Sequence, residues 1–194
     1  MTNVDNIKKS IDILSGKWLY AILAFLIVAF ISGVPQQISP KLSVLTILLA
    51  GAMAIGNAIY FLKIVRGQEA SFENLFDGFK QYVPSVIAYF LVAVIVVVGL
   101  ILLVVPGVIL GLGLSQTFFI MADDKDIPAV DAMKKSWAMM DGYKLKFFLL
   151  QLLHFLVVMA GIIALVIGVF FSFAIVNTSN ALFYESLKNG SIDS

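Results

Sequence analysis

The sequence predicts an all-helical, polytopic membrane protein, and three observations lead to this prediction. Of its 194 residues, 61% are apolar and 13% are charged, whereas soluble domains are about half apolar and about a quarter charged. The mean hydropathy is +1.02. Several apolar stretches approach or exceed the ~20 residues that a helix needs to cross a hydrocarbon layer. We therefore expect lipid, and not water, to surround most of the chain.

Six transmembrane helices, forming three tandem hairpins, are expected from the positions of the apolar stretches. The first two spans are separated by a polar loop, Pro35–Pro40. The expected spans, in chain order, are 18–34, 42–65, 85–105, 108–121 and a pair within 147–187.

The turns within 85–121 and 147–187 each admit an alternative. Pro106-Gly107 suits the central positions of a type II turn, because Pro fixes φ and Gly accepts a positive φ. One long helix kinked at Pro106 is the alternative, but it would far exceed one bilayer crossing. The stretch 147–187 is either one tilted helix or two spans that turn near Gly161 and reach Leu187. We expect two spans, because the repeat described below predicts a hairpin here.

The distribution of Lys and Arg predicts the orientation of the chain in a plasma or inner membrane. With the N-terminus in the cytoplasm, every Lys and Arg except Lys41 falls on the cytoplasmic side of the six spans. Cytoplasmic loops of membrane proteins carry an excess of these residues. We therefore expect both chain ends in the cytoplasm. The net charge of +1 gives no indication of a nucleic-acid partner.

An internal repeat divides the single membrane domain, 1–194, into three expected units. Each unit has an amphipathic helix, a glycine and a transmembrane hairpin, and the units span about 4–65, 69–122 and 130–187. The middle unit keeps the apolar register less well. Gly16, Gly78 and Gly142 follow the amphipathic positions, where a residue with positive φ would let the chain turn into the membrane. The apolar positions Val4, Ile7, Ile11 and Leu14 recur as Val130, Met133, Trp137 and Met140.

Lysines on the polar faces of these helices are expected to contact lipid headgroups. Interfacial helices bury their apolar face at the headgroup boundary, and their Lys side chains attract anionic lipid. The alternative is that these helices only pack against the spans as cytoplasmic loops. The lysines expected at the headgroups are Lys8, Lys9, Lys134 and Lys135.

A series of short motifs runs along the chain. From Leu102 it reads Leu-Leu-Val-Val-Pro-Gly-Val-Ile, followed by Phe119–Asp124, Ala132–Ser136 and Met140–Lys144. With Leu14–Trp18, Leu75–Phe79 and Ala181–Glu185, this pattern resembles an uncharacterised prokaryotic membrane family, domain of unknown function 975. It is more distantly similar to YciC-type inner-membrane proteins and to the membrane domain of glycerophosphodiester phosphodiesterases. The resemblance implies an all-helical membrane fold and brings no established activity, catalytic residue or cofactor.

Catalysis is not expected, because titratable groups converge in no recognisable motif. The chain has one His and no Cys, and hydrolytic metal sites need clusters of His, Cys or carboxylate groups. Asp123, Asp124 and Asp126 could hold a divalent cation, but a solvated, helix-capping acidic loop is the favoured interpretation. We therefore expect no enzyme activity, no metal and no cofactor.

Polar groups inside the expected spans are the candidate functional residues. Most of them fall in the cytoplasmic half of the bilayer. Either they line a cavity open to the cytoplasm, or they join neighbouring helices by hydrogen bonds, each contributing about 0.5–1 kcal/mol. The candidate lining residues are Asn57, Gln116, Gln151, His154, Asn177 and Asn180.

The leading functional hypothesis is a non-enzymatic module that binds lipid, or an amphipathic ligand, from the cytoplasmic side. Its role would lie in envelope homeostasis or in tolerance to membrane-active compounds. Membrane lipids are its expected partners, together with a second copy of the chain or another membrane protein. The rival hypotheses are a small-solute transporter using a cavity near Asn57, Gln116 and His154, and a scaffold subunit of a membrane complex.

Overall fold

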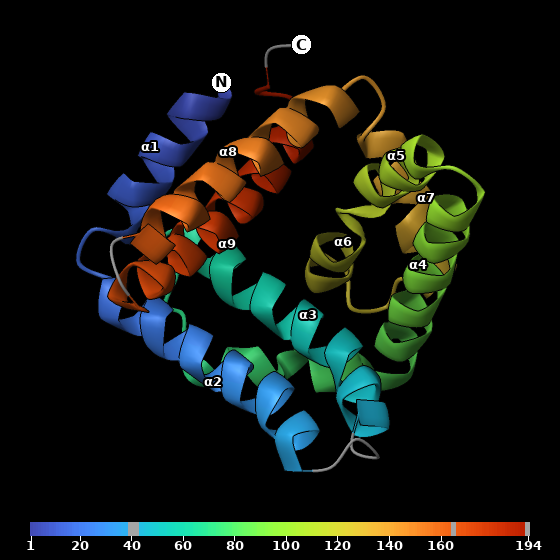
Figure 1. Cartoon of the computed structure of the whole chain (residues 1–194), viewed down its shortest axis with the longest axis horizontal. Helices are drawn as coiled ribbons and strands as arrows, with labels where there is room; N and C mark the ends of the chain where they lie inside the picture. The colour runs from blue at the N-terminus through green and yellow to red at the C-terminus, as the bar shows by residue number, and fades with distance from the viewer. Residues whose placement is uncertain (39–42, 164–165, 193–194) are drawn as a thin grey trace.

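The apolar stretches form long helices, and no strand occurs in the residues that the structure describes (Figure 1). The structure is a computed structural model, and it describes residues 1–38, 43–163 and 166–192. In chain order the helices are α1 (Asn3–Leu14), α2 (Trp18–Ile38), α3 (Ser43–Val65), the 3-10 helix η2 (Phe72–Gln81), α4 (Tyr82–Leu102), α5 (Val104–Leu114), α6 (Thr117–Asp123), α7 (Ala129–Met139), α8 (Lys144–Ile163) and α9 (Val166–Lys188).

Four helical segments of the described residues are long and apolar enough to cross a membrane. They are Thr46–Val65, Phe72–Leu102, Val104–Asp123 and Lys144–Ile163. The α1 and α2 pair, bent by 100° at the break between them, would make a fifth. The sixth expected span corresponds to α9, which is not among these segments and carries several polar residues near its centre. The chain is therefore a helical protein with four or five candidate spans, and the number six is not confirmed.

The stretch 85–121 is divided, as expected, but into the three helices α4, α5 and α6, and its first break lies before Pro106-Gly107. Helix α4 ends at Leu102, Leu103 is extended with φ −162° and ψ 140°, and α5 begins at Val104. Pro106 thus lies in the first turn of α5, where its missing N–H costs no hydrogen bond. The two helices are antiparallel and close, since a Cβ on Gly99 would lie 2.9 Å from the Cα of Gly107.

The stretch 147–187 also forms two antiparallel helices, α8 and α9, as expected from the repeat. A Cβ on Gly168 would lie 2.8 Å from the Cα of Gly161, so the helices approach closely beside their connection. The hydroxyl of Ser172 crosses between them and donates to the carbonyl oxygen of Val157 at 3.0 Å. Helix α2, in contrast, continues through Pro35 to Ile38 instead of ending at the predicted Val34. In apolar surroundings an unpaired backbone group is costly, so the helix keeps its hydrogen bonds, and a proline is tolerated within such a helix.

Helix α3 is the centre of the packing, in contact with α2, α4, α6, α9 and η2. Its small residues let η2 approach the α3 backbone directly. A Cβ on Gly56 would overlap the carbonyl of Leu75, and a Cβ on Gly78 would overlap the carbonyl of Ala52. The small residues Ala52 and Gly56 thus allow a close helix contact, with η2 as the partner.

The expected role of glycine after the amphipathic helices holds in two places and fails in one. Gly16 and Gly142 have φ of 78° and 77°, and each ends a helix as predicted. Gly78 has no positive φ and lies inside η2. Its lack of a side chain serves the contact with α3, which explains a glycine at this position without any turn.

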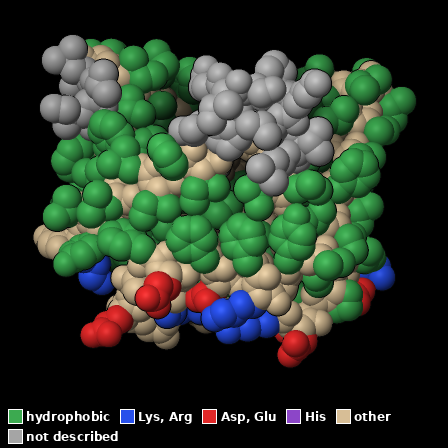
Figure 2. Space-filling view, turned by 90° about the horizontal axis from the view of Figure 1, so that it is seen from below, with side chains coloured by type: hydrophobic (Ala, Val, Ile, Leu, Met, Phe, Trp, Pro, Cys, Tyr) green, Lys and Arg blue, Asp and Glu red, His purple; other side chains and the backbone are tan. Residues whose placement is uncertain are grey.

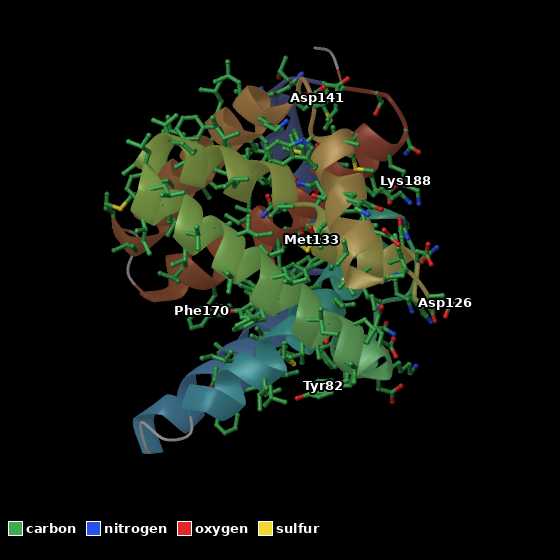
Figure 3. The ribbon with its side chains drawn as sticks, turned by 90° about the vertical axis from the view of Figure 1, so that its right-hand side faces the viewer. Tyr82, Asp126, Met133, Asp141, Phe170 and Lys188 are labelled. Atoms are coloured by element: carbon green, nitrogen blue, oxygen red, sulfur yellow. The ribbon has the colours of Figure 1, made fainter. Side chains whose placement is uncertain are left out.

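The charged residues gather at one side of the molecule. Figure 2 shows Lys, Arg, Asp and Glu side chains along one edge, with hydrophobic side chains covering the surface beyond it. In Figure 3, Asp126 and Lys188 lie at this edge, and Phe170 lies on the opposite side. The two chain ends are neighbours, since the amino group of Met1 lies 3.5 Å from the carbonyl oxygen of Ser191. Lys41, the one basic residue expected on the other side, is outside the described residues.

We predict that Gly56→Ala and Gly78→Ala each destabilise the protein by about 2 kcal/mol, because the added methyl group forces two backbones apart. The measurement is the thermal unfolding midpoint in detergent. Gly111→Ala is the matched control, since its Cβ would meet Val96 at an ordinary 3.8 Å. Unchanged stability in both test variants would show that η2 does not pack on α3 in this way.

Candidate functional site

The polar groups expected inside the spans form interhelical hydrogen bonds, and the largest group joins α1, α8 and α9. The Nδ1 atom of His154 lies 3.2 Å from Oε1 of Gln151, and its Nε2 atom lies 2.7 Å from Oγ of Ser179. Gln151 donates from Nε2 to Oδ1 of Asn180 at 3.1 Å. Oγ of Ser179 also lies 2.6 Å from Oδ1 of Asn6 on α1. The candidate residues from the sequence include Gln151, His154 and Asn180 but not Asn6 or Ser179.

Gln151 and Ser179 connect the members of this group. Gln151 donates from its amide nitrogen to Asn180, so its oxygen faces Nδ1 of His154. Ser179 donates its hydroxyl to Oδ1 of Asn6 and lies within hydrogen-bond distance of Nε2 of His154. One continuous chain of hydrogen bonds thus ties α1 to the α8–α9 pair.

The remaining expected lining residues form two smaller groups. Asn57 on α3 donates to Oδ1 of Asn177 on α9 at 2.7 Å, and Asn177 donates to the carbonyl of Phe173 at 2.9 Å. Gln116 is buried at the junction of α5 and α6, and donates to Oγ of Ser115 at 2.9 Å. These three groups are not joined in one site. The bond between Asn57 and Asn177 fits the interhelical alternative, whereas the Gln116 side chain bonds to its neighbour in sequence. The cavity beside these groups stays a prediction.

Two hollows lie instead near the ends of the helices. The larger, of about 460 Å³, lies between the start of α2 and the connection from α3 to η2. The smaller, of about 200 Å³, lies beside the end of α3. None of the expected lining residues borders either hollow. The larger one is lined by Lys17, Tyr20, Tyr60, Ile64, Gly67, Gln68, Glu69, Ala70 and Ser71.

An ion cluster that sequence reasoning missed joins the ends of α3, α6 and α9. Arg66 donates from Nε to Oε1 of Glu185 at 2.7 Å and pairs with Asp123 at 2.6 Å. Lys188 and Tyr184 donate to the other oxygen of Asp123 at 2.6 and 2.9 Å. Asp123 is thereby held by three side chains and does not act as a free ligand of the acidic loop. The only sequence signal was the family-like motifs, which contain Asp123, Tyr184 and Glu185 without indicating that they meet.

Arg66 stays charged in this cluster. Burial alone disfavours the guanidinium cation, but the hydrogen bonds to Asp123 and Glu185 outweigh it and raise the pKa of Arg66. Three helix ends that are distant in sequence are consequently joined by charge-assisted hydrogen bonds, which are stronger than neutral ones.

The lysines expected at the headgroups lie beside exposed apolar side chains on α1 and α7. Val4 and Ile11 on α1 are 51% and 40% exposed, and Val130 and Trp137 on α7 are 48% and 40% exposed. The faces that pack on the protein share only Leu14 and Met133 with the predicted apolar positions of these helices. They consist of Asn6, Ser10 and Leu14 in α1, and of Ala129, Ala132, Met133 and Ser136 in α7.

We predict that Asp123→Asn lowers the stability by about 1–3 kcal/mol, because it weakens the bonds to Arg66 and Lys188 together. Asp131→Asn is the control, since Asp131 makes only an exposed 3.4 Å contact with Lys134, and such pairs contribute about 0–1 kcal/mol. Both are measured as unfolding midpoints in detergent. Equal midpoints for the two variants would contradict the role of the ion cluster.

We predict that Ser179→Ala speeds hydrogen exchange in α1 several-fold, because it removes the link between Asn6 and His154. Ser172→Ala is the control, since its hydroxyl bonds only within the α8–α9 pair, to Val157 and Gly168. Exchange rates of the α1 amides by mass spectrometry distinguish the two. An α1 that exchanges no faster in Ser179→Ala than in Ser172→Ala would show that this chain does not hold it.

Comparison with known proteins identifies the family and nothing closer. No match is found among curated proteins or among solved structures. Residues 90–191, more than half of the chain, match the family described as protein of unknown function (DUF975). The matched region begins within α4 and includes α7, Asp123 and Glu185. The chain therefore belongs to the DUF975 family.

Proposed function

We propose that this chain is a non-enzymatic integral membrane protein that binds lipid at the cytoplasmic surface through α1 and α7. The observation that carries the proposal is the shared pattern of exposure on these two helices. In each, an exposed pair of apolar side chains flanks exposed lysines, while a buried serine faces the protein. Water would oppose this exposure of apolar groups, whereas a headgroup boundary accommodates both them and the lysines.

The correspondence between α1 and α7 extends residue by residue. Val4 matches Val130 and Ile11 matches Trp137, all exposed. Ser10 matches Ser136, both fully buried. The glycines that follow, Gly16 and Gly142, share nearly the same φ. This correspondence supports the expected repeat of units 4–65 and 130–187, and supports one common role for the two helices.

Aromatic side chains near these helices also fit a position at the membrane–water interface. The indole of Trp137 lies under Nζ of Lys144 at 4.5 Å from the ring centroid. On η2, Phe76 is exposed and stacks on Phe79, which stacks on Tyr82 at the start of α4. Aromatic rings with polar neighbours concentrate at membrane–water interfaces. The third expected amphipathic stretch thus supports the proposal with aromatic groups, although it is a 3-10 helix.

The proposed topology has six spans as three tandem hairpins, both chain ends in the cytoplasm, in a plasma or inner membrane. It is supported by the closeness of the chain ends, by the charged edge in Figure 2 and by the antiparallel α4–α5 and α8–α9 pairs. The distant similarity to YciC-type proteins and to the phosphodiesterase membrane domain fits the same fold. Membrane lipids, and a further copy or membrane protein, are the proposed partners.

The hydrogen bonds inside the spans favour lipid binding over transport. Asn57, His154 and Gln151 are bonded to side chains on neighbouring helices. A transport pathway needs polar groups directed to a solute, and the larger hollow lies elsewhere, at the helix ends.

We predict that replacing Lys8, Lys9, Lys134 and Lys135 together with Gln removes most of the preference for anionic lipid. The measurement is native mass spectrometry of full-length protein released from nanodiscs of phosphatidylglycerol and phosphatidylcholine. The wild-type protein is expected to retain phosphatidylglycerol in excess. The control replaces the same four lysines with Arg, which keeps the charge and the preference. Anionic lipid retained equally by the Gln variant would remove the basis of the proposal.

A further inference from the structure

The larger hollow has a lining that the lipid-surface proposal does not use. It is bordered by one cation, Lys17, and one anion, Glu69, from two different connections of the chain. In the described part of the chain neither of these side chains makes a salt bridge. Two opposite charges thus border one space of about 460 Å³ without neutralising each other. That volume lies within the range of about 300–1,000 Å³ typical of small-molecule sites.

Most charged residues that line the smaller hollow, in contrast, have partners within the protein. Its charged residues include Lys63, Arg66 and Asp77. Lys63 donates to Asn74 at 3.1 Å, Asp77 pairs with Lys80 at 2.5 Å, and Arg66 belongs to the ion cluster. These three charged groups have partners within the protein, whereas Lys125, which also lines this hollow, makes no salt bridge in the described residues. Lys17 and Glu69 in the larger hollow are the pair of opposite charges without such partners.

Two of the residues that line the larger hollow are tyrosines, Tyr20 and Tyr60. Tyr60 is buried and donates its hydroxyl to the carbonyl oxygen of Tyr20 at 3.0 Å, so the two residues are fixed together. Tyr60 also stacks on Phe72 with centroids 6.3 Å apart. The Tyr60 ring itself is fully buried, whereas the Tyr20 ring is exposed. Aromatic faces attract an ammonium group that lies over them. The lining thus offers a cation for a phosphate, and an anion with the exposed Tyr20 ring for an amine.

The hollow is also continuous with the lipid-facing surface of α2. Tyr20 is 55% exposed, and exposed apolar side chains recur at helical spacing along α2 beside it. These are Leu19, Leu23, Leu26 and Phe30. A ligand with its headgroup in the hollow could lay its acyl chains along this stripe, whereas a ligand without chains could not use it.

We propose that the hollow binds the headgroup of one zwitterionic phospholipid that carries both a phosphate and a primary amine, of the phosphatidylethanolamine type. Lys17 contacts the phosphate, and Glu69 contacts the ammonium beside the Tyr20 ring. The proposal deepens the lipid function and rests on the membrane location of the chain. It does not depend on Lys8, Lys9, Lys134 or Lys135.

The test is native mass spectrometry of the full chain from nanodiscs that contain equal phosphatidylethanolamine and phosphatidylglycerol. The wild-type protein is expected to keep one phosphatidylethanolamine. Lys17→Gln is expected to lower its retention about tenfold, the factor for one charge-assisted contact. Glu69→Gln is expected to reverse the preference towards phosphatidylglycerol, because Lys17 then stands alone. Retention unchanged in both variants would overturn the proposal.

Two further arms separate this site from other sources of binding. Lys125→Gln, in the smaller hollow, is the matched control and is expected to leave the bound phosphatidylethanolamine in place. The four-lysine Gln variant is expected to lose the general anionic preference and still keep this one lipid, so the two proposals fail separately. Free phosphoethanolamine is expected to bind far more weakly than a six-carbon-chain phosphatidylethanolamine. Equal binding of the two would overturn a lipid as the ligand.

Discussion

The fold depends on helix backbones coming into direct contact. Between helices in lipid no hydrophobic force favours association, since lipid tails are as apolar as the side chains they would replace. Packing contacts and hydrogen bonds must hold the helices together instead. Glycine supplies the first, at Gly56 with Gly78, at Gly99 with Gly107, and at Gly161 with Gly168. Each contact brings one helix against its neighbour at a distance that no side chain would permit.

Polar groups supply the second means of association, and whether they are neutral or charged depends on how deeply they are buried. In the interior, neutral groups bond in a chain from Asn6 to Asn180 without a formal charge. At the helix ends, where water can reach part of the surface, the same task is done by Arg66, Asp123 and Glu185. This division follows from the cost of placing an ion in hydrocarbon, which is high unless the ion is paired.

The helices themselves could be predicted from the sequence, because apolar stretches and breaks in them are local signals. The turn between α4 and α5 was expected at Pro106-Gly107 and occurs at Leu103, since a proline fits both a turn and a first helical turn. Gly78 was misread for a similar reason: glycine permits a positive φ and also a close contact, and sequence alone does not separate them.

The candidate site was less predictable, because its partners are far apart along the chain. Asn6 meets Ser179, and Arg66 meets Asp123 and Glu185, across separations that no periodic pattern records. The amphipathic faces of α1 and α7 were recognised, but only part of each predicted apolar face packs on the protein, and small residues such as Ser10, Ala132 and Ser136 share that contact. Tertiary packing selected serine and alanine there because they allow close approach, which hydropathy does not measure.

The bend of 100° between α1 and α2 has a consequence for the order of assembly. It directs α1 across to α8 and α9, where Asn3 donates to the carbonyl of Lys146 at 3.0 Å and Asn6 meets Ser179. Most contacts of α1 within the protein are with these two helices, which come last in the described residues. Helix α1 can therefore complete its packing only when α8 and α9 are in place.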